Sequence, residues 1–307
     1  MNENGKLCIV VGANGYLGGH MVLWLKSHGY PVLACDRHQD SYHSGIPYQQ
    51  LDILHRDAFD LLPEGAGVIY YFAGLTGTRE GFSRYRDYLE VNELGLLNLL
   101  HYVSGLARPP RIVYPSTRLV YRGSKGLLNE NDAREAKTVY AANKIAAELY
   151  LEAWGNARRI SWSVCRICVP YGNHLQQEYS FGTIGYFIRC ARAGNPIILY
   201  GDGSLRRTFS HVDDICRQLN IIAAHPDAHQ QIYNIAGEEY TLLNAALMVA
   251  EKAKVQVEFA PWPPEDLLIE SGDTVFDAEK ISGLVTDAVS VQFSDWVSSL
   301  SLINKRS

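Results

Sequence analysis

Short apolar runs alternate with helical patterns along the first half of the chain. Strand-like runs without polar alternation cover residues 6–13, 30–36, 67–74, 111–117 and 160–168. Patterns typical of helices lie between them, at residues 16–29, 55–62, 88–106 and 140–155. Strands of this kind, separated by helices, indicate a parallel sheet that is covered on both faces. With right-handed crossovers, the pattern predicts an α/β fold with a doubly wound, Rossmann-type sheet.

The pattern changes after about Pro170. A polar, glycine-bearing stretch follows, and beyond it helices, short strands and a proline cluster at 261–264 mix irregularly. We therefore predict a dinucleotide-binding domain at residues 1–170. Residues 171–307 are predicted to form a smaller, mixed α/β substrate lobe, with some segments returning to the main sheet.

Three glycines follow the first predicted strand and open the first predicted helix. Gly12, Gly15 and Gly18 have G-x-x-G-x-x-G spacing. Glycines allow the backbone to turn sharply and to approach a pyrophosphate closely, and the helix N-terminus supplies free N–H groups. A tight structural turn would also use glycine, but the position between strand and helix favours dinucleotide binding.

Acidic residues stand at the end of the second predicted strand and at the end of a further short strand after it. Asp36 ends the second strand, where a carboxylate can accept hydrogen bonds from an adenosine ribose and so favours NAD. Arg37 is adjacent and could neutralise a 2′-phosphate, so NADP stays an alternative. Asp52 and Ile53 are expected at the end of a short third strand, beside the adenine, although Asp52 also suits a solvated loop.

A phenol and an ammonium interrupt an apolar helical segment. Tyr140 and Lys144 are four residues apart, so on a helix they share one face. The ammonium is expected to lower the pKa of the phenol and to make it an acid/base for a sugar hydroxyl or carbonyl, with a charged cofactor ring contributing. Ser116 and Thr117 end the preceding strand, at the sheet edge where such folds bind ligands. The alternative for the pair alone is an exposed polar edge.

Taken together, these segments resemble the extended short-chain dehydrogenase/reductase family, in its NAD-dependent nucleotide-sugar epimerase/dehydratase branch. The resemblance covers about residues 7 to 236. It is carried, in family order, by GANGYLG (12–18), Asp36, LDI (51–53), YYFAG (70–74), VNELGLLNLL (91–100), PSTRLVY (115–121), YAANK (140–144), CRICVPYGN (165–173) and GDGSLRRTFSHVDD (201–214).

The resemblance implies a role for each matching residue. Tyr140 would be the catalytic acid/base, Lys144 would hold the nicotinamide ribose, and Thr117 or Ser116 would contact the reacting hydroxyl. Arg207 would bind the nucleotide diphosphate, and Cys168 would stand where the family has a substrate-contacting Asn. The cofactor set would be Gly12, Asn14, Gly15, Tyr16, Leu17, Gly18, Asp36, Arg37, Asp52, Ile53, Ala73, Gly74, Asn92 and Lys144.

Three departures from the family pattern concern the substrate. Arg118 and Leu119 follow Thr117, where the dehydratase branch has Asp-Glu, and this argues against 4,6-dehydration. Cys168 replaces the usual Asn. Before the late GD motif the chain offers Glu270 and Ser271 where a second Arg is common. The predicted substrate pocket is therefore altered.

The resemblance implies hydride transfer at a sugar C4. An epimerase retains its NAD, whereas a 4-ketoreductase consumes NAD(P)H. A non-catalytic nucleotide-binding protein is a further alternative, although the Ser/Thr, Tyr and Lys set disfavours it. The resemblance also implies a homodimer through the helices at 88–103 and 140–154, and bacterial surface-polysaccharide biosynthesis as the commonest setting.

Charge and cysteine usage narrow the partners and the compartment. The net charge of −5 over 307 residues disfavours a nucleic-acid partner or an anionic membrane surface. No signal peptide and no membrane span are expected from the sequence. Six cysteines are scattered through apolar segments, as in a cytoplasmic protein with reduced thiols. Cys165 and Cys168 have C-x-x-C spacing but lie in a strand-like run, so we expect no metal there.

Overall fold

The computed structural model describes residues 5–175, 181–286 and 289–302. The chain divides into two compact units that interleave along the sequence. The first unit comprises Met1–Val120, Arg134–Arg166 and Cys216–Tyr233, and the second comprises Tyr121–Ala133, Ile167–Ile215 and Asn234–Ser307. Residues 121–133, 167–170 and 216–233 thus belong to a different unit from the one that a single boundary at residue 170 would give.

A seven-stranded sheet forms the centre of the first unit, and its strands have the order β3-β2-β1-β4-β5-β7-β11. The first five strands pair in parallel. This arrangement confirms the predicted doubly wound sheet, and β11 is a late segment that joins it. The strands are β1 Cys8–Val11, β2 Val32–Asp36, β3 Tyr48–Gln50, β4 Val68–Tyr71, β5 Arg111–Thr117, β7 Trp162–Ile167 and β11 Gln231–Asn234.

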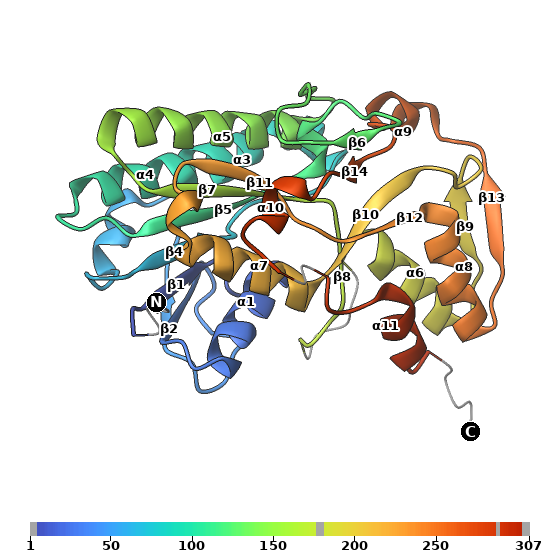
Figure 1. Ribbon diagram of the computed structural model, residues 1–307, viewed down its shortest axis with the longest axis horizontal. Helices are drawn as coiled ribbons and strands as arrows, with labels where there is room; N and C mark the ends of the chain where they lie inside the picture. The colour runs from blue at the N-terminus through green and yellow to red at the C-terminus, as the bar shows by residue number, and fades with distance from the viewer. Residues whose placement is uncertain (1–4, 176–180, 287–288, 303–307) are drawn as a thin grey trace. The chain divides into compact units, whose positions relative to one another are not determined.

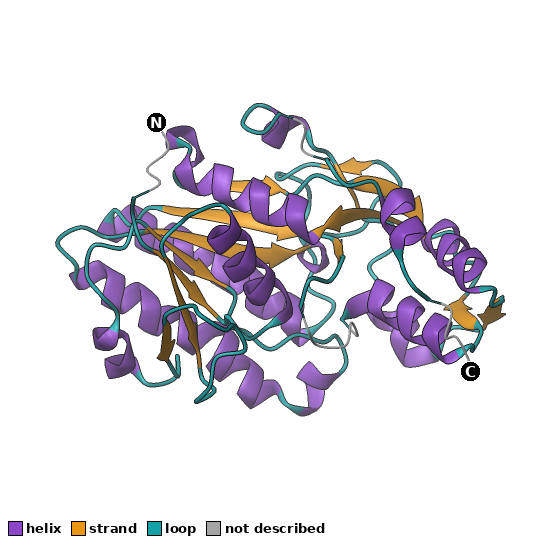
Figure 2. Ribbon diagram, turned by 90° about the horizontal axis from the view of Figure 1, so that it is seen from below, coloured by secondary structure: helices purple, strands orange, loops and turns teal. Residues whose placement is uncertain are grey.

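Helices cover both faces of this sheet (Figure 2). In Figure 1, α3, α4 and α5 lie on one side, and α1 and α7 lie on the other. The α4–α5 side encloses a large apolar core that includes Tyr71, Leu99 and Tyr114. The helical segments are α1 Tyr16–Ser27, η1 Arg56–Leu61, α2 Glu80–Ser83, α3 Tyr85–Leu89, η2 Glu90–Leu94, α4 Gly95–Gly105, η3 Arg118–Val120, α5 Val139–Arg158, α7 Val212–Ala224 and η4 Pro226–Ala228.

Three predicted elements differ in detail from the structure. The helix expected at 88–106 is interrupted by η2, a π-helical segment that places Asn92 toward the interior. The third strand ends at Gln50, so Asp52 and Ile53 follow the strand and do not end it. The run at 160–168 extends past β7 into β8, because Val169 pairs with Phe209 in another sheet.

The second unit contains three small sheets: β12-β10-β8, β13-β9 and β14-β6. Its strands are β6 Leu127–Leu128, β8 Val169–Tyr171, β9 Ile197–Tyr200, β10 Arg206–His211, β12 Glu238–Thr241, β13 Val257–Ala260 and β14 Val275–Phe276. Its helices are α6 Gly182–Ala193, α8 Leu242–Ala253, α9 Pro264–Ile269, α10 Glu279–Ser282 and α11 Phe293–Ser299. This mixture agrees with the irregular pattern after Pro170. Within the described ranges, no helix is long and apolar enough to cross a membrane.

The turn between β1 and α1 requires glycine at two positions. Gly12 has φ +86°, and a Cβ atom there would lie 2.5 Å from the backbone nitrogen of Ala73. A Cβ atom on Gly18 would lie 2.1 Å from the carbonyl oxygen of Gly12. The chain therefore packs β1, the turn and α1 as closely as a dinucleotide-binding turn demands.

All six cysteines are free thiols, and five of them are buried. Burial raises the pKa of Cys8 to about 11 and that of Cys35 to about 12. We expect Ellman's reagent to label one thiol quickly in the native protein, at the partly exposed Cys190, and all six after unfolding. Cys190→Ser should remove the fast phase, and a fast phase that persists in this variant would contradict the assignment.

Candidate active site

A cavity of about 260 Å³ lies in the first unit, at the carboxyl ends of β1, β2 and β4. Nine of the predicted cofactor residues line it, and they come from the glycine turn and from the segments after the second, third and fourth strands. These are Gly12, Asn14, Gly15, Asp36, Arg37, Asp52, Ile53, Ala73 and Gly74. The lining also includes seven residues that were not predicted: Val11, His38, Leu51, Leu54, Phe72, Leu75 and Val91.

The cavity has the chemistry that a dinucleotide needs. Gly15 is the N-cap residue of α1, and no acidic residue lies in the first turn of that helix. The helix N-terminus therefore offers free N–H groups and partial positive charge to a pyrophosphate. Asp36 places a carboxylate in the cavity lining, where one was predicted for ribose hydroxyls, and it accepts the Asn14 backbone N–H at 3.0 Å.

Five predicted cofactor residues lie outside this lining. Tyr16, Leu17 and Gly18 form the first turn of α1 and are not part of the cavity wall. Lys144 lies on α5 and Asn92 lies in η2. Their cofactor roles therefore stay predictions.

Asn92 connects the cavity wall to the helix that carries Tyr140. Its Oδ1 accepts the Leu75 N–H at 2.7 Å, and its Nδ2 donates to the Leu75 carbonyl at 3.1 Å. The same Nδ2 lies 3.5 Å from Oδ1 of Asn143 on α5. The π-helical segment thus turns an amide inward, where it holds both the chain after β4 and the helix of Tyr140.

The structure separates the two hydroxyls that the sequence left as alternatives. The Thr117 side chain hydrogen-bonds with the Tyr140 phenol, and this bond acts to lower the pKa of Tyr140. Ser116 Oγ instead donates to Oε1 of Glu148 at 2.6 Å. Thr117 is therefore the hydroxyl that lies beside the phenol.

Lys144 is buried on the face of α5 that also carries Tyr140. Its Nζ donates to the Pro115 carbonyl at 2.8 Å and lies 4.3 Å from the ring centroid of Tyr114. The distance from Nζ to the ring centroid of Tyr140 is 5.8 Å. Burial lowers the pKa of Lys144 to about 7, although the negative charge of Glu148 acts in the opposite direction.

The prediction that Lys144 lowers the pKa of Tyr140 is wrong for this structure. Desolvation by the surrounding protein raises the pKa of the phenol above its usual value, and the opposing influence comes from Thr117. With a pKa of about 7, Lys144 has lost its proton over the range in which such a phenol would ionise, and its Nζ is directed to the Pro115 carbonyl.

The low pKa of Lys144 makes stability depend on pH. The folded-state pKa is about 7 and the reference value is 10.5, so the unfolded chain binds more protons between these values. Stability therefore rises with pH in this range, and the burial cost is fully present below pH 7. Between pH 7 and 9, the unfolding free energy of the native sequence should rise by about 2 kcal/mol relative to Lys144→Met. Urea denaturation measures this difference, and exposed Lys26→Met is the control.

A buried ion pair joins α5, the helix of Tyr140 and Lys144, to β7. It was not predicted from the sequence. Glu148 on α5 accepts from Arg166 Nε at 3.0 Å and from Arg166 Nη2 at 2.6 Å. Both side chains are 1% exposed. The available signal was a carboxylate four residues after Lys144, on the apolar face of the helix.

The two predicted substrate residues lie in the second unit, and both contact Thr274. Arg207 on β10 forms a β-bridge with Thr274, and Cys168 Sγ lies 3.3 Å from the Thr274 carbonyl. Arg207 is 2% exposed and donates to Oε1 of Glu270 at 2.6 Å. Glu270 stands where the family commonly has a second Arg, and here it neutralises Arg207. Diphosphate binding by Arg207 therefore stays a prediction.

One group of metal-type donors lies in the described part of the second unit. His174, His211 and Asp213 bring their ligand atoms within 4.8 Å of one another. The Asp213 backbone N–H donates to His211 Nδ1 at 3.2 Å, and α7 begins at Val212. The positive helix N-terminus disfavours a cation at this place, so the group does not define a metal centre.

The parallel sheet, the glycine turn and the cavity define a dinucleotide-binding enzyme of the doubly wound α/β class. A family model described as "NAD dependent epimerase/dehydratase family" matches residues 8–236. The chain belongs to this family. It is therefore an NAD-dependent enzyme of the extended short-chain dehydrogenase/reductase type, which confirms the predicted enzyme class and cofactor.

Named relatives agree with this assignment. The chain is 26% identical over 262 residues to a UDP-glucuronate 4-epimerase of Thermodesulfobacterium geofontis, covering 80% of this chain and 79% of the relative. It is 25% identical over 247 residues to a UDP-N-acetyl-alpha-D-glucosaminuronate decarboxylase of Bacillus cytotoxicus, covering 76% of each. The solved UDP-glucose 4-epimerase of Thermus thermophilus, in complex with NAD, has a TM-score of 0.82 and is 24% identical, over 95% of this chain and 97% of that one. This last likeness supports the fold.

Proposed function

We propose that the protein is a nucleotide-sugar epimerase that inverts the sugar C4 by reversible hydride transfer, with Tyr140 as its acid/base. One observation carries the proposal: Tyr140 pairs with Thr117 at the carboxyl end of β5, in the unit that holds the cofactor cavity. A hydroxyl that binds between these two groups would meet both a proton acceptor and a donor.

Each residue has a defined part in this mechanism. Bound NAD supplies the hydride acceptor and the positive charge of its oxidised ring. Tyr140 removes the proton from the C4 hydroxyl and returns it after the 4-keto sugar has rotated to present its opposite face. Thr117 orients that oxygen. Because burial raises the pKa of Tyr140, the Thr117 hydrogen bond and nearby positive charge must lower it for the forward step.

UDP-sugars are the proposed substrate class. The relative from Thermodesulfobacterium geofontis is named a UDP-glucuronate 4-epimerase, so UDP-glucuronate is the first compound to assay. Arg118 and Leu119 follow Thr117 in place of the dehydratase Asp-Glu, which favours epimerisation over elimination. Arg207, which the resemblance assigns to the nucleotide diphosphate, has its charge offset by Glu270 within the second unit.

The purified protein tests the proposal directly. It should convert one member of a panel of UDP-, GDP-, CDP- and dTDP-sugars to its C4 epimer without added cofactor. Mass spectrometry should detect NAD bound to the purified protein. Stoichiometric consumption of NADH or NADPH would identify a 4-ketoreductase instead, and release of CO₂ from a uronate would identify a decarboxylase. Saturable binding without turnover of any compound would favour a non-catalytic protein.

A homodimer is part of the same proposal. The helices that the resemblance assigns to a dimer interface expose apolar side chains at Leu89, Leu94 and Leu149, which are 52%, 44% and 45% exposed. We expect light scattering to give about twice the 34.3 kDa chain mass, and Leu94→Glu with Leu149→Glu to give the monomer. Leu268→Glu, at a residue 77% exposed on α9, is the control. A monomeric native protein would contradict this part of the proposal.

A further inference from the structure

The carboxylate of Asp36 already has protein donors on both oxygens. Oδ2 accepts the Asn14 backbone N–H at 3.0 Å, and Oδ1 accepts from His38 Nδ1 at 2.8 Å. A carboxylate has about four acceptor sites, so it can still bind ribose hydroxyls. The imidazole nevertheless stands beside the very group that is expected to distinguish NAD from NADP.

His38 is held in this position through three contacts. Its ring contacts Asp36 and stacks on Tyr42 at a centroid distance of 5.8 Å, and its backbone carbonyl accepts the Tyr48 hydroxyl at 2.5 Å. Its side chain is still 48% exposed, and the residue lines the cofactor cavity. Its second ring nitrogen, Nε2, has no hydrogen-bond partner among the residues that the structure describes.

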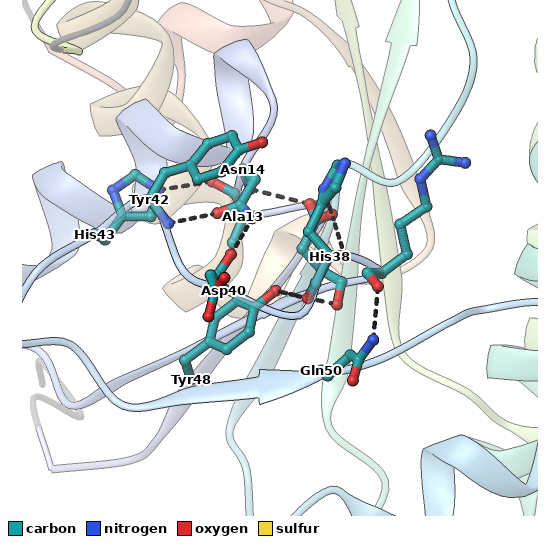
Figure 3. A network of polar contacts seen from close by, with 10 residues as sticks. Ala13, Asn14, His38, Asp40, Tyr42, His43, Tyr48 and Gln50 are labelled. Carbon is teal, nitrogen blue, oxygen red and sulfur yellow. Dashed lines mark hydrogen bonds and ion pairs between the residues drawn. The ribbon is translucent and has the colours of Figure 1, made fainter.

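The segment that carries His38 is fastened to the glycine turn (Figure 3). Asn14 Nδ2 donates to the Asp40 carbonyl at 3.0 Å, and Asn14 Oδ1 accepts the Tyr42 N–H at 3.0 Å. The buried His43 ring contacts the Ala13 carbonyl through Nε2 at 2.8 Å. These bonds fix the segment after β2 over the turn, so His38 has a fixed position in the cavity wall.

Acidic groups outnumber basic ones around this wall, so an added positive charge on His38 would change its balance. Arg37 also lines the cavity, and it has no ion-pair partner within the described part of the chain. Asp36, Asp40 and Asp52 are the acidic groups of the same region, from β2, the following segment and the stretch after β3. Desolvation raises the pKa of Tyr48, on β3, to about 12, so this phenol stays neutral near pH 7.

We propose that His38 sets the cofactor choice of this enzyme through its protonation state. With the neutral ring, Nδ1–H donates to Asp36 and Nε2 presents a lone pair, which suits a ribose hydroxyl and repels a 2′-phosphate. With the imidazolium, Nε2–H becomes a donor. His38 then offsets the Asp36 charge, and together with Arg37 it accepts the 2′-phosphate of NADP. The neutral ring thus favours NAD, and the imidazolium admits NADP.

Calorimetric titration of the cofactor-free full chain with NAD⁺ and NADP⁺, at pH 8.0 and 5.8, tests this proposal. His38→Asn is the decisive variant, because its amide nitrogen can keep the bond to Asp36 and it lacks the titrating ring. His38→Ala is the second variant. His101→Gln changes an exposed histidine on α4, outside the cavity lining, and serves as the control.

The ratio of dissociation constants, NADP⁺ over NAD⁺, should fall about tenfold from pH 8.0 to 5.8 in the native and His101→Gln proteins. In His38→Asn it should fall by no more than about twofold to threefold. If the ratio falls equally in the native protein and in His38→Asn, the effect comes from the 2′-phosphate or from His43, and the proposal is overturned. The absence of NADP⁺ binding at either pH would also overturn it. The proposal rests on the cofactor and not on the sugar, so failed epimerisation with intact NAD⁺ binding would leave it standing.

Discussion

Tyr140→Phe is expected to lower turnover of the nucleotide sugar by at least about 100-fold, while NAD⁺ binding stays unchanged. The substitution removes one oxygen from a side chain on α5 and leaves the ring in place. Without the phenol, no group in the Thr117 pair can accept the C4 proton, because a threonine hydroxyl is a far weaker base than a phenolate. The loss should appear in kcat more than in KM, since the proton moves in the transition state.

Tyr150→Phe provides the matched control for this experiment. Tyr150 lies on the same helix, and its hydroxyl donates to Oε2 of Glu93 at 2.8 Å, away from the Thr117 pair. This variant should keep near-native turnover. Thr117→Val should lose turnover partially, and Ser116→Ala should lose less, because Ser116 is bonded to Glu148. Retention of more than a tenth of native turnover by Tyr140→Phe would sink the acid/base assignment.

The fold was predictable because its signals are local. The apolar run at 111–117 matches β5, and the glycine spacing at 12–18 matches the turn between β1 and α1. The four-residue separation of Tyr140 and Lys144 needed only a helix to place both on one face. Such patterns depend on neighbours in sequence, so a sequence displays them directly.

The parts that escaped prediction depend on partners that are distant along the chain. Glu148 acquires its role only when β7 brings Arg166 to it, and Arg207 is neutralised by a residue more than 60 positions later. His38 gains its place because Asn14 and Tyr48 fasten the segment around it. The reversed pKa shift of Tyr140 has the same origin, since desolvation depends on the whole surrounding fold.

Glu148→Gln is expected to lower the unfolding free energy by about 3 kcal/mol, because it leaves the buried Arg166 guanidinium without its counter-charge. The variant also removes the negative charge that raises the pKa of Lys144, so that pKa should fall further below 7. Less of Lys144 is then protonated near neutral pH. Because the resemblance assigns the Lys144 ammonium to the nicotinamide ribose, turnover should decline, and the alkaline limb of its pH profile, where Lys144 loses its proton, should move to lower pH.

Urea denaturation and pH–rate profiles separate these two effects. Glu152→Gln, an exposed carboxylate on the same helix, should change neither quantity. Replacing both partners, Glu148→Met with Arg166→Met, should recover stability relative to Glu148→Gln, because no buried charge remains unpaired. The double variant should nevertheless keep the altered pH profile, since Lys144 still lacks its neighbouring carboxylate. A Glu148→Gln protein as stable as the native one would show that Arg166 finds another counter-charge, and it would remove Glu148 from the account of how Lys144 stays protonated.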